Sequence, residues 1–165
     1  MCFFRRKKSI PVVADVTDIC LSVLYKKVMG KNWCLPACAQ MILAYYGMNI
    51  AQSIIANRVV VNGEPSTFRL LSYARGLGYE ADWKRIPMVE IENYLKKGIP
   101  LIVLQKYSLN LPYEHSRVIF GFDKPKQELT LHDPSGRSNY KISYKEFFGL
   151  NFSASEMSQI VILKK

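Results

Sequence analysis

The architecture of this chain follows from one segment, residues 32–47, which reads NWCLPACAQMILAYYG. The segment predicts a helix from Leu35 to Tyr46, because Pro36 fits a first helical turn and Gly47 suits a C-terminal cap. Apolar side chains cover more than one face of this helix. We therefore expect it to be central and buried.

The rest of the sequence divides into a helical half and a strand half. Further helices are predicted from Ile50 to Arg58, Thr67 to Arg75 and Val89 to Lys96. After Pro100, short β-branched and apolar runs between turn signals predict strands at 101–104, 116–122, 128–132, 140–142 and 159–163. Helices followed by antiparallel strands define an α+β fold class, with a cleft between the two halves.

The composition excludes some classes of protein but does not by itself identify the function. The chain has 165 residues, of which 49% are hydrophobic, and this is enough for one domain with its own core. It has no run of about 18 apolar residues that would cross a membrane. The net charge of +10 suits an anionic partner. Nucleic acid is disfavoured, because the cations are scattered and form no recognisable binding motif.

The N-terminus is basic. Four cations follow two phenylalanines: Arg5, Arg6, Lys7 and Lys8. They would suit weak contact with an anionic membrane surface, and a solvated terminus is the alternative. We divide the chain into this extension, residues 1–20, which can be flexible, and one domain, residues 21–165. No secretory signal peptide follows the basic run, which favours a cytoplasmic or membrane-associated protein and leaves secretion open.

The cysteines do not suggest a disulfide scaffold. All four lie in the first quarter of the chain: Cys2, Cys20, Cys34 and Cys38. Together with the two histidines they could in number form a Cys2His2 site, but their spacing matches no common zinc module. Reduced thiols are the simpler interpretation.

Three residues form a candidate site: Cys34, His115 and Asp133. Cys34 lies at the start of the buried helix, where free N–H groups and the helix dipole favour a thiolate. His115 opens one predicted strand and Asp133 closes the next. Antiparallel pairing brings these strand ends together, so the carboxylate can orient the imidazole as a base for the thiol.

Each residue also has a structural alternative. A lone cysteine at a helix start is usually part of the core, and an aspartate before proline usually caps a turn. Cys38 is the rival nucleophile, but it lies one turn inside the helix, where we expect it to be packed. His132 is the rival base, and its alternation with Leu131 predicts that it points away from the site and out of the core.

Residues 32–47 resemble the cysteine helix of the bacteriocin-processing (double-glycine leader) peptidases, which are papain-like cysteine peptidases that also occur as stand-alone relatives. Later blocks are similar in the same order: Gly98-Ile99-Pro100, His115 to Asp123, His132-Asp133-Pro134, and Glu146-Phe147. The resemblance spans about residues 25–163. It implies a papain-like fold, with a helical half packed on an antiparallel sheet.

The resemblance also implies roles: Cys34 as nucleophile, His115 as base and Asp133 as the orienting carboxylate. In two places the sequence departs from the family. Leu35 replaces the glycine that usually follows the cysteine, and Val28 replaces the upstream glutamine that completes the oxyanion hole. The backbone N–H of Cys34 remains as one donor, and Asn32 or Lys27 are candidates for the second.

The first hypothesis is therefore a cysteine peptidase that cleaves a peptide or protein substrate through an acyl-enzyme, without a cofactor. The alternative is a peptidase-like domain, weak or inactive in catalysis, that binds a leader or substrate peptide. The missing glutamine favours the alternative, and the intact triad favours the enzyme. The sequence carries no signal for the oligomeric state.

Overall fold

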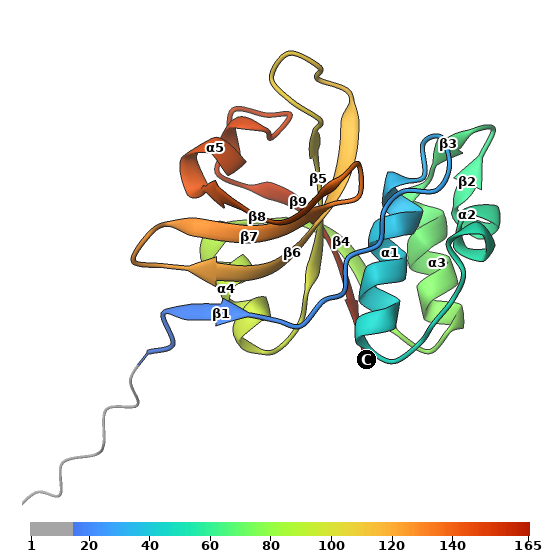
Figure 1. Cartoon of the computed structure of the whole chain (residues 1–165), viewed down its shortest axis with the longest axis horizontal. Helices are drawn as coiled ribbons and strands as arrows, with labels where there is room; N and C mark the ends of the chain where they lie inside the picture. The colour runs from blue at the N-terminus through green and yellow to red at the C-terminus, as the bar shows by residue number, and fades with distance from the viewer. Residues whose placement is uncertain (1–14) are drawn as a thin grey trace, which may run out of the picture.

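The computed structural model describes residues 15–165 as a mixed α+β fold (Figure 1). A seven-stranded antiparallel sheet runs in the order β4-β9-β5-β6-β7-β8, and β1 pairs with β6 beside this path. The strands are β1 Asp18–Cys20, β4 Glu80–Ile86, β5 Leu101–Lys106, β6 Glu114–Asp123, β7 Glu128–Asp133, β8 Arg137–Ser143 and β9 Ser158–Lys164. Two short strands, β2 Val60–Val61 and β3 Glu64–Pro65, form a separate hairpin.

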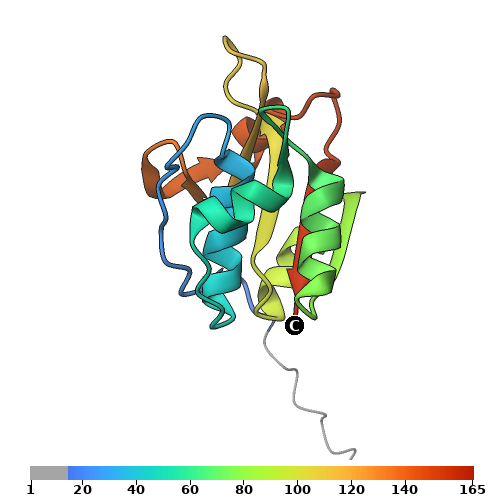
Figure 2. The same ribbon diagram turned by 90° about the vertical axis from the view of Figure 1, so that its right-hand side faces the viewer.

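The helices cover both sides of the sheet. They are α1 Cys34–Tyr45, α2 Gln52–Val59, α3 Thr67–Gly76, α4 Met88–Lys96 and α5 Tyr144–Gly149. Helices α1, α2 and α3 lie together in front of the sheet in Figure 2, and α4 and α5 pack on the other side. None of the helices in residues 15–165 has the length and apolar character needed to cross a membrane.

The predicted layout is confirmed. Each of the four predicted helices begins and ends within two residues of its expected limits, and all five predicted strands form. Alternate residues of β5 feed two separate cores. Ile102 and Leu104 join the cluster under α1 to α3, and Leu101 and Val103 join the cluster under α4 and α5. Since both faces of β5 are buried, its first four residues, 101–104, form a continuous apolar run without polar alternation.

Strand β4 is the longest strand that the sequence did not predict. It lies at the edge of the sheet and pairs only with β9. Only Ala81 and Ile86 of its seven residues are buried, and four others are exposed charged residues, so its apolar signal is weak.

Strand β1 concerns the predicted boundary between the N-terminal extension and the domain. Its residues fall within the range 1–20, yet Asp18 pairs with Asp123 and Cys20 with Gly121, so the sheet begins before residue 21. The four cations of the extension, Arg5 to Lys8, lie outside the described residues. Their contact with a membrane surface stays a prediction.

Candidate active site

Cys34 is the first residue of α1 and is partly exposed. The chain before it turns sharply, because Asn32 adopts a left-handed backbone with φ of 59°. The Trp33 ring packs onto Gly30, where an added Cβ would lie 2.4 Å from the ring. The turn delivers the thiol to the N-terminus of α1, where backbone N–H groups lack intrahelical acceptors and the helix dipole is positive.

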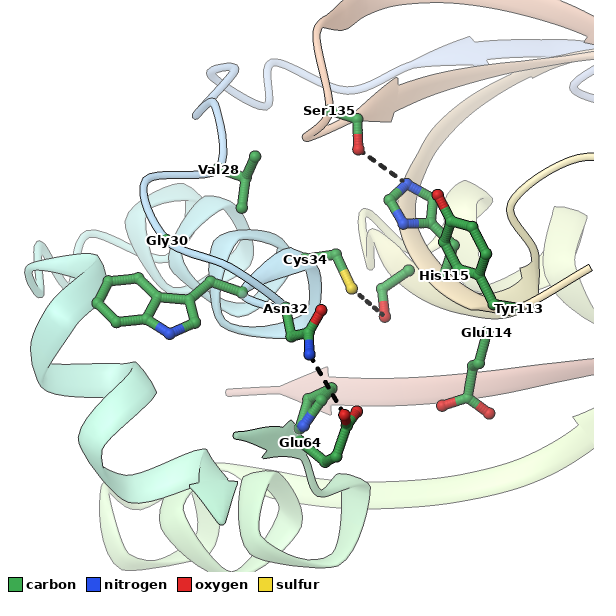
Figure 3. A pocket seen from close by; sticks show the side chains of 12 residues that line it. Val28, Gly30, Asn32, Cys34, Glu64, Tyr113, Glu114, His115 and Ser135 are labelled. Atoms are coloured by element: carbon green, nitrogen blue, oxygen red, sulfur yellow. Dashed lines mark hydrogen bonds between the residues drawn. The ribbon is translucent and has the colours of Figure 1, made fainter. Parts of the chain in front are cut away.

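His115 and Asp133 meet across neighbouring strands. His115 lies near the start of β6 and Asp133 ends β7, and the pairing of Val118 with His132 sets the two strand ends side by side. The Nε2 atom of His115 lies 2.7 Å from Oδ1 of Asp133, and both residues are 4% exposed. In Figure 3 the other ring nitrogen of His115 lies on the side of Cys34.

The surroundings lower the pKa of the Cys34 thiol and raise the pKa of His115. Burial is the largest single influence on each and opposes the charged forms. For Cys34 it is outweighed mainly by hydrogen bonding to His115 and by the charge of the imidazolium. For His115 it is outweighed by hydrogen bonds to Asp133 and Cys34. Burial also opposes the charge on Asp133, but the hydrogen bond from His115 and the nearby Arg117 lower its pKa to about 2. Together these groups favour a thiolate–imidazolium pair next to a carboxylate.

The thiol opens into a cleft of about 530 Å³ between the helical half and the sheet, as Figure 3 shows. This agrees with the cleft predicted between the two halves. The lining residues come from the loop before α1, the β2–β3 hairpin, the start of β6 and the turn after β7: Val28, Gly30, Asn32, Trp33, Cys34, Glu64, Pro65, Tyr113, Glu114, His115, Ser116 and Ser135. In residues 15–165, no three or more His, Cys, Asp or Glu side chains are grouped so as to hold a metal ion.

Val28, at the position of the missing glutamine, and the candidate oxyanion donor Asn32 both line the cleft. Val28 lines the cleft, and its backbone N–H donates to the Pro134 carbonyl at 2.9 Å, which fixes it beside the turn after β7. The side-chain N–H of Asn32 donates to the Gly63 carbonyl at 3.0 Å and to Glu64 at 3.3 Å. The role of Asn32 as second donor stays a prediction, and it would require one of these bonds to break.

The two rival residues lie outside the cleft. Cys38 is fully buried, and burial raises the pKa of its thiol well above the usual value. His132 also lies outside the cleft, but the prediction that it points out of the core is wrong, since it is 1% exposed. Alternation does turn His132 away from Leu131, onto a face that is itself covered by Tyr25 and Phe120.

The sequence did not single out three neighbours of the triad. The Cys34 thiol donates to Oγ of Ser116 over 3.9 Å, and Oγ of Ser135 lies 3.5 Å from Nε2 of His115. The Nε–H of Arg117 donates to Oδ2 of Asp133 at 2.9 Å. Arg117 could have been found from the sequence, because residues two apart in a strand share a face and His115 is two residues earlier.

The fold and site define a class: a mixed α+β protein with the papain-like arrangement of a central cysteine helix packed on an antiparallel sheet. The particular family follows from the sequence, because residues 16–158 match the Peptidase_C39 like family. The chain belongs to this family. No curated protein matches the sequence.

Solved structures agree with the fold. The peptidase domain of Streptococcus ComA, a bifunctional ABC transporter involved in quorum sensing, superimposes with a TM-score of 0.70 at 19% identity, over 86% of this chain and 98% of that one. A C39-like peptidase from Bacillus anthracis gives 0.70 at 16% identity, over 90% and 98%. A double-glycine-motif protease from an AMS/PCAT transporter, solved with its leader peptide, gives 0.68 at 24% identity, over 88% and 93%.

Proposed function

We propose that this protein is a cysteine peptidase that uses Cys34 as nucleophile, His115 as acid and base, and Asp133 as the orienting carboxylate. The observation that carries the proposal is the buried 2.7 Å bond between Nε2 of His115 and Asp133. This bond holds the ring so that its Nδ1 serves the thiol, and the pKa values of the two groups shift toward the charged pair.

The chemistry follows from this arrangement. The Cys34 thiolate attacks the peptide carbonyl carbon, and the resulting oxyanion accepts a hydrogen bond from the Cys34 backbone N–H. The His115 imidazolium gives its proton to the leaving amine nitrogen, the C–N bond breaks, and a thioester remains. Neutral His115 then removes a proton from water, the hydroxide attacks the thioester, and the thiolate leaves with the carboxylic acid product released.

The substrate that fits this site is a peptide in extended conformation. The cleft is lined by the loop before α1, the β2–β3 hairpin and the start of β6, so an extended peptide lying in it would contact segments of both halves of the fold. The AMS/PCAT protease of similar fold was solved with a leader peptide. We propose a precursor or leader peptide as the substrate class here too.

A peptide-binding domain without efficient catalysis is the second candidate. One observation favours it: Val28 lines the cleft where a side-chain oxyanion donor is expected, and the amide N–H groups of Asn32 are already bonded. Loss of one oxyanion donor lowers the rate by roughly 100- to 1,000-fold. Such a protein would keep the thiol and bind peptides while turning them over slowly.

Two measurements test the proposal. The first is the rate of alkylation of each thiol by iodoacetamide against pH, followed by peptide mapping. We expect Cys34 to react at lower pH than an ordinary thiol, and His115→Ala to remove this advantage. The second is cleavage of a peptide library by the wild type, by Cys34→Ala, and by Cys20→Ser, which changes an exposed thiol outside the cleft.

The outcomes separate the candidates. Cleavage by the wild type and by Cys20→Ser, and its loss in Cys34→Ala, supports the peptidase. A reactive Cys34 without cleavage supports the binding domain. An unreactive Cys34 without cleavage refutes the proposed role of the thiol.

A further inference from the structure

We propose that Arg117 is a positioning residue that fixes both neighbours of the His115 imidazole: the carboxylate on one side and the Tyr107 ring on the other. This inference rests on the proposed function. Arg117 is 4% exposed, which is unusual for arginine, so its guanidinium needs partners that compensate for its burial.

The first partner of Arg117 is Asp133. The two carboxylate oxygens of Asp133 bind different partners. Oδ1 accepts hydrogen bonds from His115 at 2.7 Å and from the Ser135 backbone N–H at 2.9 Å. Oδ2 accepts a hydrogen bond from Nε–H of Arg117 at 2.9 Å. Without Arg117, Oδ2 would be a buried oxygen with its charged partner removed. The carboxylate would then be held only through Oδ1, by His115 and the Ser135 backbone N–H, and its plane could turn about that oxygen.

The other partners lie at the end of β5. Nη1 of Arg117 donates to the Lys106 carbonyl at 3.1 Å, and Nη2 donates to the Tyr107 carbonyl. The Tyr107 ring meets the His115 ring edge to face, with centroids 4.9 Å apart. It also stacks on Tyr113, which lines the cleft, at 5.1 Å. The Arg117 guanidinium therefore fixes the backbone at the end of β5, and with it Tyr107, whose ring packs against the His115 imidazole.

This geometry distinguishes a positioning role from a purely structural one. The effect of Arg117 through Asp133 requires the Asp133 carboxylate, whereas its effect through Tyr107 does not. A residue that merely stabilises the fold has the same effect whether or not that carboxylate is there. The deciding measurement is therefore whether the effects on kcat of replacing Arg117 and of replacing Asp133 are additive.

The experiment is a double-mutant cycle of Arg117→Met and Asp133→Asn in the full chain. We expect Arg117→Met alone to lower kcat by roughly 100-fold with KM changed less than about threefold, as for a catalytic group displaced by about 1 Å. In the Asp133→Asn background the same change should cost at least about tenfold less, because only the effect through Tyr107 remains. Arg75→Met is the matched control, because Arg75 donates to the Ala81 carbonyl outside the cleft, and it should leave kcat unchanged.

Equal losses of kcat in the two backgrounds, or a change in KM alone, would overturn the proposal. If Arg117→Met does not fold, Arg117→Lys replaces it in the cycle, since lysine keeps the charge but cannot span Asp133 and both carbonyls. If the wild type cleaves no peptide, the peptidase proposal fails on its own. The cycle is then read from the alkylation rate of Cys34 near pH 6, where the same non-additivity supports the role of Arg117 and its absence refutes it.

Discussion

His132 provides the clearest test of how the core supports the site. Its Nε2–H donates to the Val23 carbonyl at 2.8 Å, and its Nδ1 accepts from the Asn139 backbone N–H at 3.1 Å. The ring stacks on Phe120 with centroids 4.2 Å apart and lies 5.3 Å from the ring of Tyr25. A neutral imidazole with one donor and one acceptor satisfies both partners.

The change His132→Ala removes both hydrogen bonds and leaves a cavity. Each lost bond costs about 1 kcal/mol net, and the unfilled ring volume costs about 2 kcal/mol more. We expect the free energy of unfolding to fall by about 4 kcal/mol, which in a domain of this size lowers Tm by roughly 8–16 °C. The site itself should survive, because His132 lies outside the cleft.

Urea unfolding, with the slope m compared between proteins, measures the stability, and alkylation of Cys34 below the transition measures the site. We expect the folded variant to react within about threefold of the wild type, whereas His115→Ala should lose this reactivity. A stability loss below about 1 kcal/mol would refute the argument from burial. Loss of Cys34 reactivity in a fully folded His132→Ala would mean that His132 serves the site.

The stability difference should also depend on pH. Burial lowers the pKa of His132 below its usual value near 6.5. At higher pH the ring is neutral in both states, so the full difference between wild type and variant is present. As the pH falls below about 6.5 the unfolded wild type gains a proton that the folded protein does not. The advantage of the wild type should therefore shrink by up to about 1.4 kcal/mol per pH unit. A difference that grows with acidity would contradict this assignment.

Three further predictions concern the oxyanion hole, the thiolate and the sheet. Val28→Gln should raise kcat by roughly 100-fold by adding a donor to the cleft wall; an unchanged kcat in an already fast wild type would assign that role to another group. Ser116→Ala should move the alkylation profile of Cys34 to higher pH, because the Ser116 hydroxyl, which accepts from the thiol, turns to donate to the thiolate and lowers the pKa of Cys34; an unshifted profile would contradict this. Gly121→Ala should cost about 1–3 kcal/mol in thermal unfolding, since its Cβ would lie 2.7 Å from the Ile19 carbonyl oxygen; a loss below about 0.5 kcal/mol would show that β1 yields.

Local signals in the sequence were sufficient for much of the fold. The cysteine helix is marked by Pro36 and Gly47, and the strands after Pro100 by turn residues between apolar runs. The nearness of His115 and Asp133 also followed from the sequence, because two antiparallel strands with a short connection must place the start of one beside the end of the next.

Other features depend on what covers each surface. The sequence correctly turned His132 away from Leu131, but only the packing of residues 23–25 over that face made it a buried, neutral ring.

Strand pairing likewise explains β4. Its apolar pattern is weak, and the segment forms a strand because it pairs with the edge of β9. The ties of Arg117 to Asp133 and to the end of β5 join parts of the chain up to sixteen residues apart. Periodicity within one strand identifies which side chains share a face. It does not reveal which distant groups meet them there, because burial and hydrogen-bond partners are properties of the assembled chain.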